Sequence, residues 1–161
     1  MGDRSITTPP PRADVALADL PDLVGTTFGP SSWRTVTQDE VNRFADLTGD
    51  HNPVHLDPDF AARTPFGGTI AHGYLTLSLG PVLMPTILTV SGIRMGVNYG
   101  ANKVRFLSPV KVGGRIRLGA ELSKLEELPG NGAQVYMTFT FEIEGSDKPA
   151  CVAEIIFRYY E

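Results

Sequence analysis

The chain has 161 residues, of which 42% are hydrophobic and 20% charged, and its formal net charge is −4. This length is typical of one domain, and the composition is that of a globular protein rather than a disordered one. No basic cluster is present to bind nucleic acid, so no nucleic-acid partner is expected.

Cysteine content and apolar runs indicate where the chain works. Cys151 is the only cysteine, so no internal disulfide can form, and we expect a buried thiol in the reducing cytoplasm. Residues 1–20 lack the apolar core of a secretory signal. The longest apolar run, residues 74–90, is interrupted by Pro81 and Pro85 and is too broken to span a membrane. A cytoplasmic protein without a membrane partner is therefore expected.

The chain divides into a short arm and one domain. Residues 1–18 include the run Thr7-Thr8-Pro9-Pro10-Pro11 and have little to bury, so we expect a flexible N-terminal arm there. A single domain is expected over residues 19–161. Within it, residues 26–36 are rich in β-favouring residues and are predicted to form the first strand, with Trp33 as a packing anchor.

The first helix is predicted from its end signals. Thr37 is a good N-cap, and Glu40 three residues later completes a capping box. Apolar residues then recur at helical spacing, which predicts a helix over residues 38–47. Gly49 can adopt the left-handed conformation that commonly ends a helix. Pro53 is expected to prevent the helix from resuming.

Two further helical segments follow. Asp57-Pro58 is an N-cap followed by a proline at the first helical position, which predicts a short helix to about Ala62. After a loop that contains Gly67-Gly68, the segment from Ala71 to about Leu83 is apolar on nearly all sides. A helix of that kind is typically buried.

The C-terminal half changes to the period of β-strands. Residues 115–122 and 135–143 alternate apolar and polar side chains, and Gly130-Asn131-Gly132 predicts a turn between them. Further strands are predicted over residues 97–106 and 150–159. Strands joined by short turns must be antiparallel, because parallel strands need long crossovers. We therefore predict an α+β fold with an antiparallel sheet of about five strands.

The residues that can do chemistry lie together in one stretch. Asp50, Asn52 and His55 surround a proline in a rigid polar turn, and Ala71-His72-Gly73 then opens the long apolar segment. A carboxylate and an imidazole close to each other are the groups that general acid–base catalysis uses. We interpret this stretch as an active site.

The spacing Asp50-x-x-x-x-His55 with Asn52-Pro53 inside it, followed by Ile70-Ala71-His72-Gly73, resembles the hydratase motif of the MaoC-like (R)-specific enoyl-CoA hydratases. The resemblance extends over residues 33–159. It implies a single hotdog domain, in which the sheet wraps around a long central α-helix. It also implies the reversible syn hydration of trans-2-enoyl-CoA to (3R)-hydroxyacyl-CoA.

The resemblance assigns expected roles to the motif residues. Asp50 and His55 would together hold the catalytic water. The sequence allows either of them to remove the water proton; we take Asp50 as the base and His55 as the group that binds and orients the water. Asn52 would hold substrate or water through its amide. The backbone N–H of Gly73, at a helix start, would stabilise the charge that develops on the thioester oxygen. His72 is grouped with these substrate and oxyanion residues, although a role in shaping the loop is the preferred interpretation.

An acyl pocket and partners are expected as well. The expected pocket residues are Phe66, Tyr74, Leu75 and Leu79, each of which would serve equally well as a core residue. The implied substrate is an acyl thioester of coenzyme A or of acyl-carrier protein, and no cofactor is expected. A homodimer is expected because pairing two sheets edge to edge protects an open sheet edge.

Other functions are compatible with the same fold. A 3-hydroxyacyl thioester dehydratase of fatty-acid or polyketide elongation would run the same chemistry in reverse. A non-catalytic acyl-CoA-binding hotdog protein would have no use for Asp50 and His55 as an acid–base pair. A hotdog thioesterase would need a carboxylate from the central helix, and residues 74–90 contain none.

A metal centre is the remaining alternative. Five residues of ligand type lie close in sequence: Asp50, His51, His55, Asp57 and Asp59. The histidine pair would suit zinc if it lay on one helical face. Pro53 lies between the two histidines and breaks that geometry, so no metal is expected.

Overall fold

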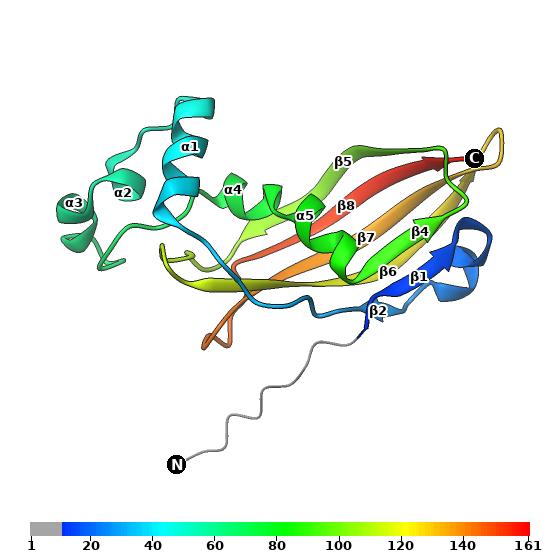
Figure 1. Ribbon diagram of the computed structural model, residues 1–161, viewed down its shortest axis with the longest axis horizontal. Helices are drawn as coiled ribbons and strands as arrows, with labels where there is room; N and C mark the ends of the chain where they lie inside the picture. Colours follow the sequence, from blue (N-terminus) through cyan, green and yellow to red (C-terminus); the bar gives the residue numbers. More distant parts are fainter. Residues whose placement is uncertain (1–10) are drawn as a thin grey trace, which may run out of the picture.

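The largest element of the structure is an antiparallel sheet. The computed structural model describes residues 11–161. Within them the sheet comprises β2 (Thr27–Phe28), β3 (Arg34–Thr35), β5 (Met95–Phe106), β6 (Arg115–Leu128), β7 (Gly132–Ile143) and β8 (Cys151–Tyr160). The strand order is β2-β6-β7-β8-β5, and β3 also pairs with β6 (Figure 1). The α+β class and the antiparallel pairing are confirmed.

Alternate residues of β6 and β7 build the core. Leu118 pairs with Phe141 and Ala120 pairs with Phe139, and all four side chains are buried. Full burial of a leucine or phenylalanine side chain contributes roughly 1.5–3 kcal/mol to stability. Cys151 at the start of β8 is buried too, and its burial raises the pKa of the thiol to about 11.

The central helical segment crosses the sheet in pieces rather than as the single helix expected over residues 71–83. Its parts are α4 (Gly73–Ser78), α5 (Gly80–Leu83) and the 3-10 turn η2 (Met84–Thr86). Pro81 has no N–H to continue the helical hydrogen bonds, so α4 ends before Leu79 and a new helix, α5, begins at Gly80. Figure 1 shows the segment lying across the strands of the sheet, and α4 contacts β8 while α5 contacts β6.

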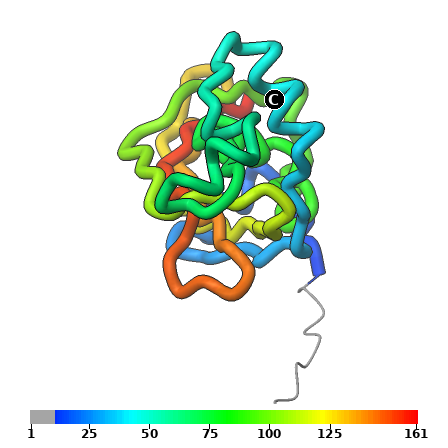
Figure 2. Tube along the Cα trace, turned by 90° about the vertical axis from the view of Figure 1, so that its left-hand side faces the viewer, coloured from blue at the N-terminus to red at the C-terminus, as the bar shows by residue number. Residues whose placement is uncertain are grey.

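Three short helices gather at one end of the sheet, where Figure 2 shows them in front of the strands. They are α1 (Gln38–Thr48), α2 (Pro53–Leu56) and α3 (Pro58–Ala62). The capping box at Thr37 and Glu40 is confirmed, and Gly49 ends α1 with a φ of 78°. The expectation that Pro53 only blocks a helix is wrong, because Asn52 caps a new helix that begins at the proline.

The N-terminal part of the described chain is ordered by the rest of the fold. Strand β1 (Ala13–Ala16) pairs in parallel with β4 (Leu88–Ser91), and η1 (Leu17–Leu23) follows β1. Leu17 and Leu20 are buried. The expected flexible arm is therefore wrong for residues 13–18, and its first ten residues lie outside the described part of the chain.

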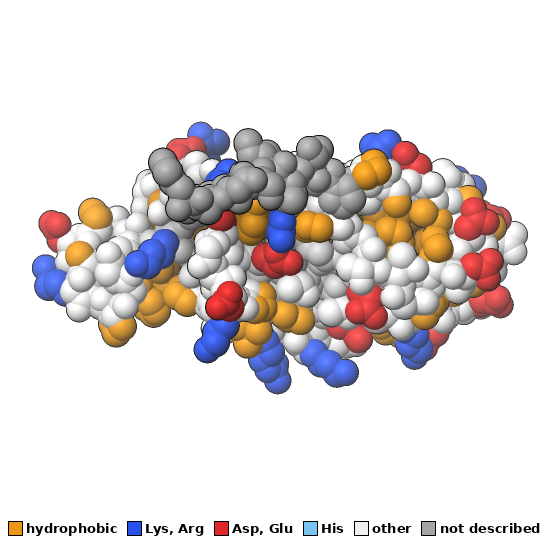
Figure 3. Space-filling model, turned by 90° about the horizontal axis from the view of Figure 1, so that it is seen from below, with side chains coloured by type: hydrophobic (Ala, Val, Ile, Leu, Met, Phe, Trp, Pro, Cys, Tyr) orange, Lys and Arg blue, Asp and Glu red, His pale blue; other side chains and the backbone are white. Residues whose placement is uncertain are grey.

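The strand predicted over residues 26–36 is present as two short strands, β2 and β3, which each pair with β6. Between them, the Ser31 N–H donates to the Leu118 carbonyl of β6 at 2.8 Å. Trp33 lies in that interval with the guanidinium of Arg117 4.4 Å from its ring centroid. On the face seen in Figure 3, acidic and basic side chains are interspersed with apolar ones. Across residues 11–161, no helix has both the length and the apolar character needed to cross a membrane.

Candidate active site

The turn after α1 carries Asp50 and is held by local hydrogen bonds. The Asp50 N–H donates to the Thr48 hydroxyl, and the Asp50 carboxylate accepts from the Asn52 N–H, both at 3.4 Å. The Asp50 side chain is 57% exposed. Asp50 therefore presents its carboxylate to solvent from a turn whose own bonds are long.

His55 lies on α2, and its ring is anchored to the main chain. Its Nδ1 lies 2.7 Å from the carbonyl oxygen of Ile70. A carbonyl oxygen can only accept, so Nδ1 carries the proton and Nε2 is left with a lone pair. His55 is thereby prepared to accept a hydrogen bond or a proton at Nε2.

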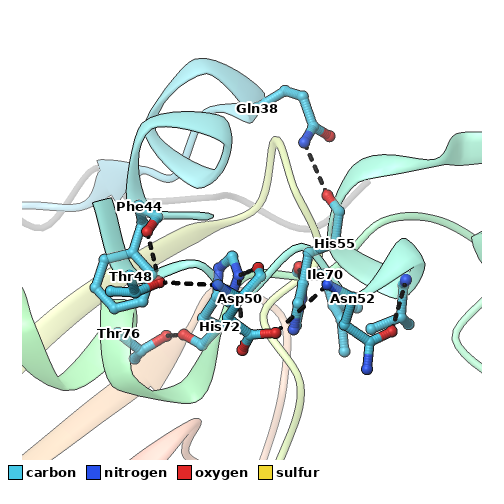
Figure 4. A network of polar contacts seen from close by, with 10 residues as sticks. Gln38, Phe44, Thr48, Asp50, Asn52, His55, Ile70, His72 and Thr76 are labelled. Atoms are coloured by element: carbon cyan, nitrogen blue, oxygen red, sulfur yellow. Dashed lines mark hydrogen bonds and ion pairs between the residues drawn. The ribbon is translucent and has the colours of Figure 1, made fainter. Parts of the chain in front are cut away.

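His72 lies beside both residues. Its Nε2 is 3.0 Å from the main-chain carbonyl oxygen of Asp50 and 4.0 Å from the Asp50 carboxylate. Its ring stacks on the ring of His55, with centroids 3.8 Å apart and planes inclined by 30°. Ligand-type atoms of Asp50, His55 and His72 all lie within 4.8 Å of one another (Figure 4). The structure thus brings together three residues that the sequence singled out.

Asp50, His55 and His72 are also residue types that bind cations. Zinc in proteins takes four tetrahedral ligands, with nitrogen and oxygen donors at roughly 2.0–2.2 Å. Here His55 Nδ1 and His72 Nε2 are directed at main-chain carbonyls, and the two rings are stacked on each other rather than arranged around one point. The three residues therefore do not have the geometry of a zinc site.

A cavity of about 300 Å³ opens next to His55. It is lined by His55, Phe66, Ile70, Ala71, Gly73, Thr76, Phe106, Leu107, Ser108, Pro109, Val110 and Ala150. Most of these side chains are apolar, as expected where an acyl thioester would lie. The run Phe106-Leu107-Ser108-Pro109-Val110 supplies five of the lining residues.

Gly73 is the first residue of α4 and lines this cavity. Within residues 11–161, its N–H has no hydrogen-bond acceptor, as befits the first turn of a helix. A Cβ at this position would lie 2.9 Å from the ring of Phe106, so only glycine fits without a shift of that ring. Gly73 therefore combines a free backbone donor with close packing against the Phe106 ring.

The other expected pocket residues are placed differently. Leu75 and Leu79 are buried in the hydrophobic core and do not line the cavity beside His55. Tyr74 is 69% exposed and packs edge-on against Phe106, with centroids 5.5 Å apart. Of the four expected residues, Phe66 lines the cavity.

Two polar residues of the motif have local partners. The Asn52 side-chain oxygen accepts from the Val54 N–H at 3.2 Å and so caps α2, which leaves its amide nitrogen for other contacts. His51 points away and lies 2.9 Å from the carboxylate of Asp46. That hydrogen bond raises the pKa of His51, whose side chain is exposed.

The chain is similar in sequence to a known domain family and to named proteins. Residues 19–138 match the family model described as the MaoC like domain. The 3-hydroxyacyl-thioester dehydratase Z of Mycobacterium tuberculosis is 51% identical over 144 residues, which cover 89% of this chain and 95% of that protein. The (R)-specific enoyl-CoA hydratase of Aeromonas caviae is 40% identical over 88 residues, which cover 55% of this chain and 63% of that protein.

The fold is similar to the solved structures of two R-hydratases. The R-hydratase PhaJ1 from Pseudomonas aeruginosa superposes with a TM-score of 0.67 at 31% identity, covering 86% of this chain and 82% of that one. The (R)-hydratase from Aeromonas caviae superposes with a TM-score of 0.68 at 30% identity, covering 83% of this chain and 94% of that one.

Proposed function

Since the chain belongs to the MaoC-like domain family and has the hotdog fold of the R-hydratases, we propose that it interconverts trans-2-enoyl thioesters and (3R)-3-hydroxyacyl thioesters. Its relatives are named dehydratases and hydratases, so the chain is an enzyme of the hydro-lyase class. The observation that carries the proposal is the convergence of Asp50 and His55 beside a cavity that His55 and Gly73 line.

The proposed reaction uses one water. In the hydration direction, the water oxygen bonds to the β-carbon while Asp50 takes a proton from that water. The electron pair of the double bond moves toward the thioester carbonyl and forms an enolate. The α-carbon then takes the proton back from Asp50, so the H and OH of one water are added on the same face. Dehydration runs the same steps in reverse.

His55 has the role of water ligand in this scheme. Its Nδ1–H is committed to the Ile70 carbonyl, which leaves Nε2 to accept the second O–H of the water. The water is then held by two acceptors, Asp50 and His55. Both its position and its orientation are thereby fixed before attack.

The enolate oxygen needs a donor. The Gly73 N–H has no acceptor within residues 11–161 and lies at the N-terminal, positive end of α4. Loss of one preorganised donor of this kind costs roughly 10²–10³-fold in turnover in other enzymes. We assign the Gly73 N–H to the thioester oxygen and the free amide nitrogen of Asn52 to substrate or water.

The names of two relatives bear on the carrier and on the direction of the reaction. The relative with 51% identity is named a 3-hydroxyacyl-thioester dehydratase, which supports dehydration of an acyl thioester. The Aeromonas relative is named an enoyl-CoA hydratase, which supports coenzyme A as a carrier. We therefore propose an acyl-CoA or acyl-carrier-protein thioester as substrate, with the reaction reversible and no metal or cofactor taking part.

A homodimer is proposed from the sheet edge. Strand β5 is at the end of the strand order and pairs only with β8 among the described strands. Its side chains Met95, Val97, Tyr99 and Phe106 are exposed apolar groups. Pairing with a second copy would cover both these groups and the open backbone edge. Analytical ultracentrifugation should give twice the chain mass, and a monomer at micromolar concentration would refute the dimer.

The activity is tested with short thioesters. Wild-type protein should consume the enoyl absorbance of crotonyl-CoA and should form it from (3R)-3-hydroxybutyryl-CoA, but not from the (3S) isomer. The same substrates on acyl-carrier protein compare the two carriers, and longer enoyl-CoAs give the preferred chain length. Tight binding of crotonyl-CoA and its longer homologues without turnover would instead identify a non-catalytic acyl-CoA-binding protein.

A further inference from the structure

We propose that His72 is a positioning residue: it holds the Asp50 turn in position and fixes the orientation of the His55 ring, without touching the substrate itself. This inference rests on the proposed function, because it concerns the same pair of residues. It makes specific the role in shaping the loop that the sequence favoured, and it sets aside the grouping of His72 with the substrate and oxyanion residues, since His72 does not line the cavity in which the thioester would lie.

The first support is the contact with Asp50. The carbonyl oxygen of Asp50 accepts from His72 Nε2 at 3.0 Å, whereas the local bonds of the Asp50 turn to Thr48 and Asn52 are both 3.4 Å. Asp50 is largely exposed, and His72 is 3% exposed. The shortest of these bonds therefore ties an exposed catalytic turn to a buried side chain.

The second support is the contact with His55. The His72 ring lies against the His55 ring with centroids 3.8 Å apart. The bond from His55 Nδ1 to Ile70 fixes one point of the His55 ring but leaves the ring free to tilt about it. The stacked face of His72 restricts that tilt and so sets the direction of the Nε2 lone pair.

The third support is that His72 is itself firmly held. Its carbonyl accepts the first hydrogen bond of α4, from the Thr76 N–H at 3.1 Å. Its ring also packs against the ring of Phe44 of α1, with centroids 5.0 Å apart. His72 thus connects α1, the Asp50 turn, α2 and α4, which is the arrangement visible in Figure 4.

The fourth support is an orphaned atom. The Nδ1 of His72 is buried and has no hydrogen-bond partner within the described residues. Because the Asp50 carbonyl can only accept, Nε2 carries the proton and Nδ1 presents an unsatisfied lone pair. A buried acceptor without a partner costs stability, so packing alone does not explain an imidazole here. The Nε2 donor toward Asp50 does explain it.

The test is a thioester hydration assay on variants of His72 that keep or remove its hydrogen-bond donor to Asp50. His72→Gln places an amide N–H near the Nε2 position, His72→Asn places one near Nδ1, and His72→Leu supplies neither donor nor ring. We expect His72→Leu to lose about 10- to 100-fold in kcat with KM unchanged, as for a misplaced catalytic group. His72→Gln restores the donor but not the stacked ring, so it should recover part of that loss, whereas His72→Asn should recover none of it.

Val41→Ala is the matched control, because it removes fully buried packing from α1 but leaves the contacts of His72 with Asp50, His55 and Phe44 in place. It should keep the wild-type kcat, even if the protein melts at a lower temperature. If Val41→Ala lowers kcat as far as His72→Leu does, general packing and not positioning is responsible, and the inference is wrong.

Other results would refute the role of His72 or the proposed function itself. A folded His72→Leu protein with wild-type kcat refutes the inference, and a raised KM at constant kcat would return His72 to substrate binding. If His72→Leu does not fold, equal activity of His72→Gln and His72→Asn refutes it instead. A wild-type protein inactive on every thioester removes the proposed function itself, whereas an active wild type with insensitive His72 variants removes only the role of His72.

Discussion

The sheet and the site end of the molecule are held together in different ways. In β6 and β7, inward side chains such as Leu118 and Phe141 are fully buried and face each other in register. At the site end, Asp50 is largely exposed, and the imidazoles of His55 and His72 are fixed by bonds to main-chain carbonyls. Stability and chemistry therefore depend on separate sets of residues, and substitutions in each region should affect one property and spare the other.

The largest effect is expected in the sheet. Phe141→Ala removes a fully buried ring that contacts Phe139, with centroids 6.2 Å apart. Truncations of this kind cost roughly 3–5 kcal/mol because they lose apolar burial and leave a cavity. Urea unfolding should show that loss, while kcat per folded molecule stays at the wild-type value. A destabilisation below about 1 kcal/mol would mean that the sheet core is not packed as described.

The next effect belongs to the site. Asp50→Asn and His55→Gln should each lower turnover by at least about 10²-fold, the low end of general acid–base contributions. The unfolding free energy of Asp50→Asn should stay within about 0.5 kcal/mol of wild type, because its side chain is exposed. Undiminished turnover in either folded variant would remove that residue from the mechanism.

A smaller effect is expected where the two regions meet. Gly73→Ala places a Cβ 2.9 Å from the ring of Phe106, which must shift into the cavity. Overpacking of this kind costs about 1–3 kcal/mol of folding stability. Because the displaced ring also lines the cavity, kcat/KM should fall by about 10-fold or more, which corresponds to about 1.4 kcal/mol in the activation free energy. Gly68→Ala is the control, since no atom lies within 4 Å of its added Cβ.

The same substitution has a rescue. Shortening the ring side chain in the double variant Gly73→Ala with Phe106→Leu should recover much of the lost kcat/KM, because the Cβ then has room. If the double variant is no better than Gly73→Ala alone, the ring contact is not the cause of the loss.

The smallest effect is a pH dependence of the α1 cap. Burial raises the pKa of Glu40, but hydrogen bonds from the Thr37 N–H and the Arg34 guanidinium outweigh it and hold the pKa below its usual 4.5. A carboxyl whose pKa is lowered by folding adds stability above its unfolded pKa, and that stability is lost as the pH falls through the folded value. Glu40→Gln should therefore reduce stability near pH 7 and flatten the acid limb of the stability curve below about pH 4.5. An unchanged acid limb would contradict this.

The sequence predicted the features that depend on local pattern. The capping box at Thr37 and Glu40 and the period-two strands were visible because neighbouring residues determine them. The spacing of Asp50 and His55 predicted residues that the structure brings within 4.8 Å of each other and of His72.

Features that depend on long-range contacts were not predictable in this way. The sequence of strand β1 resembles that of a flexible arm, because its strand partner β4 lies more than seventy residues later in the chain. Uniform apolarity marked the central segment as buried but could not distinguish Leu75 and Leu79 as core residues from cavity-lining residues. The contact of His72 with the Asp50 carbonyl could not be predicted from residue types, since every residue has a main-chain carbonyl.

Hydration of crotonyl-CoA in D₂O tests the central claim most directly, because one water held by Asp50 and His55 must deliver both of its parts to one face of the double bond. The stereochemistry of the product can be read by NMR. The account predicts the (3R)-hydroxy product with a single deuterium at C2 on the same face as the new hydroxyl group. Deuterium on the opposite face, or a (3S) product, would contradict it.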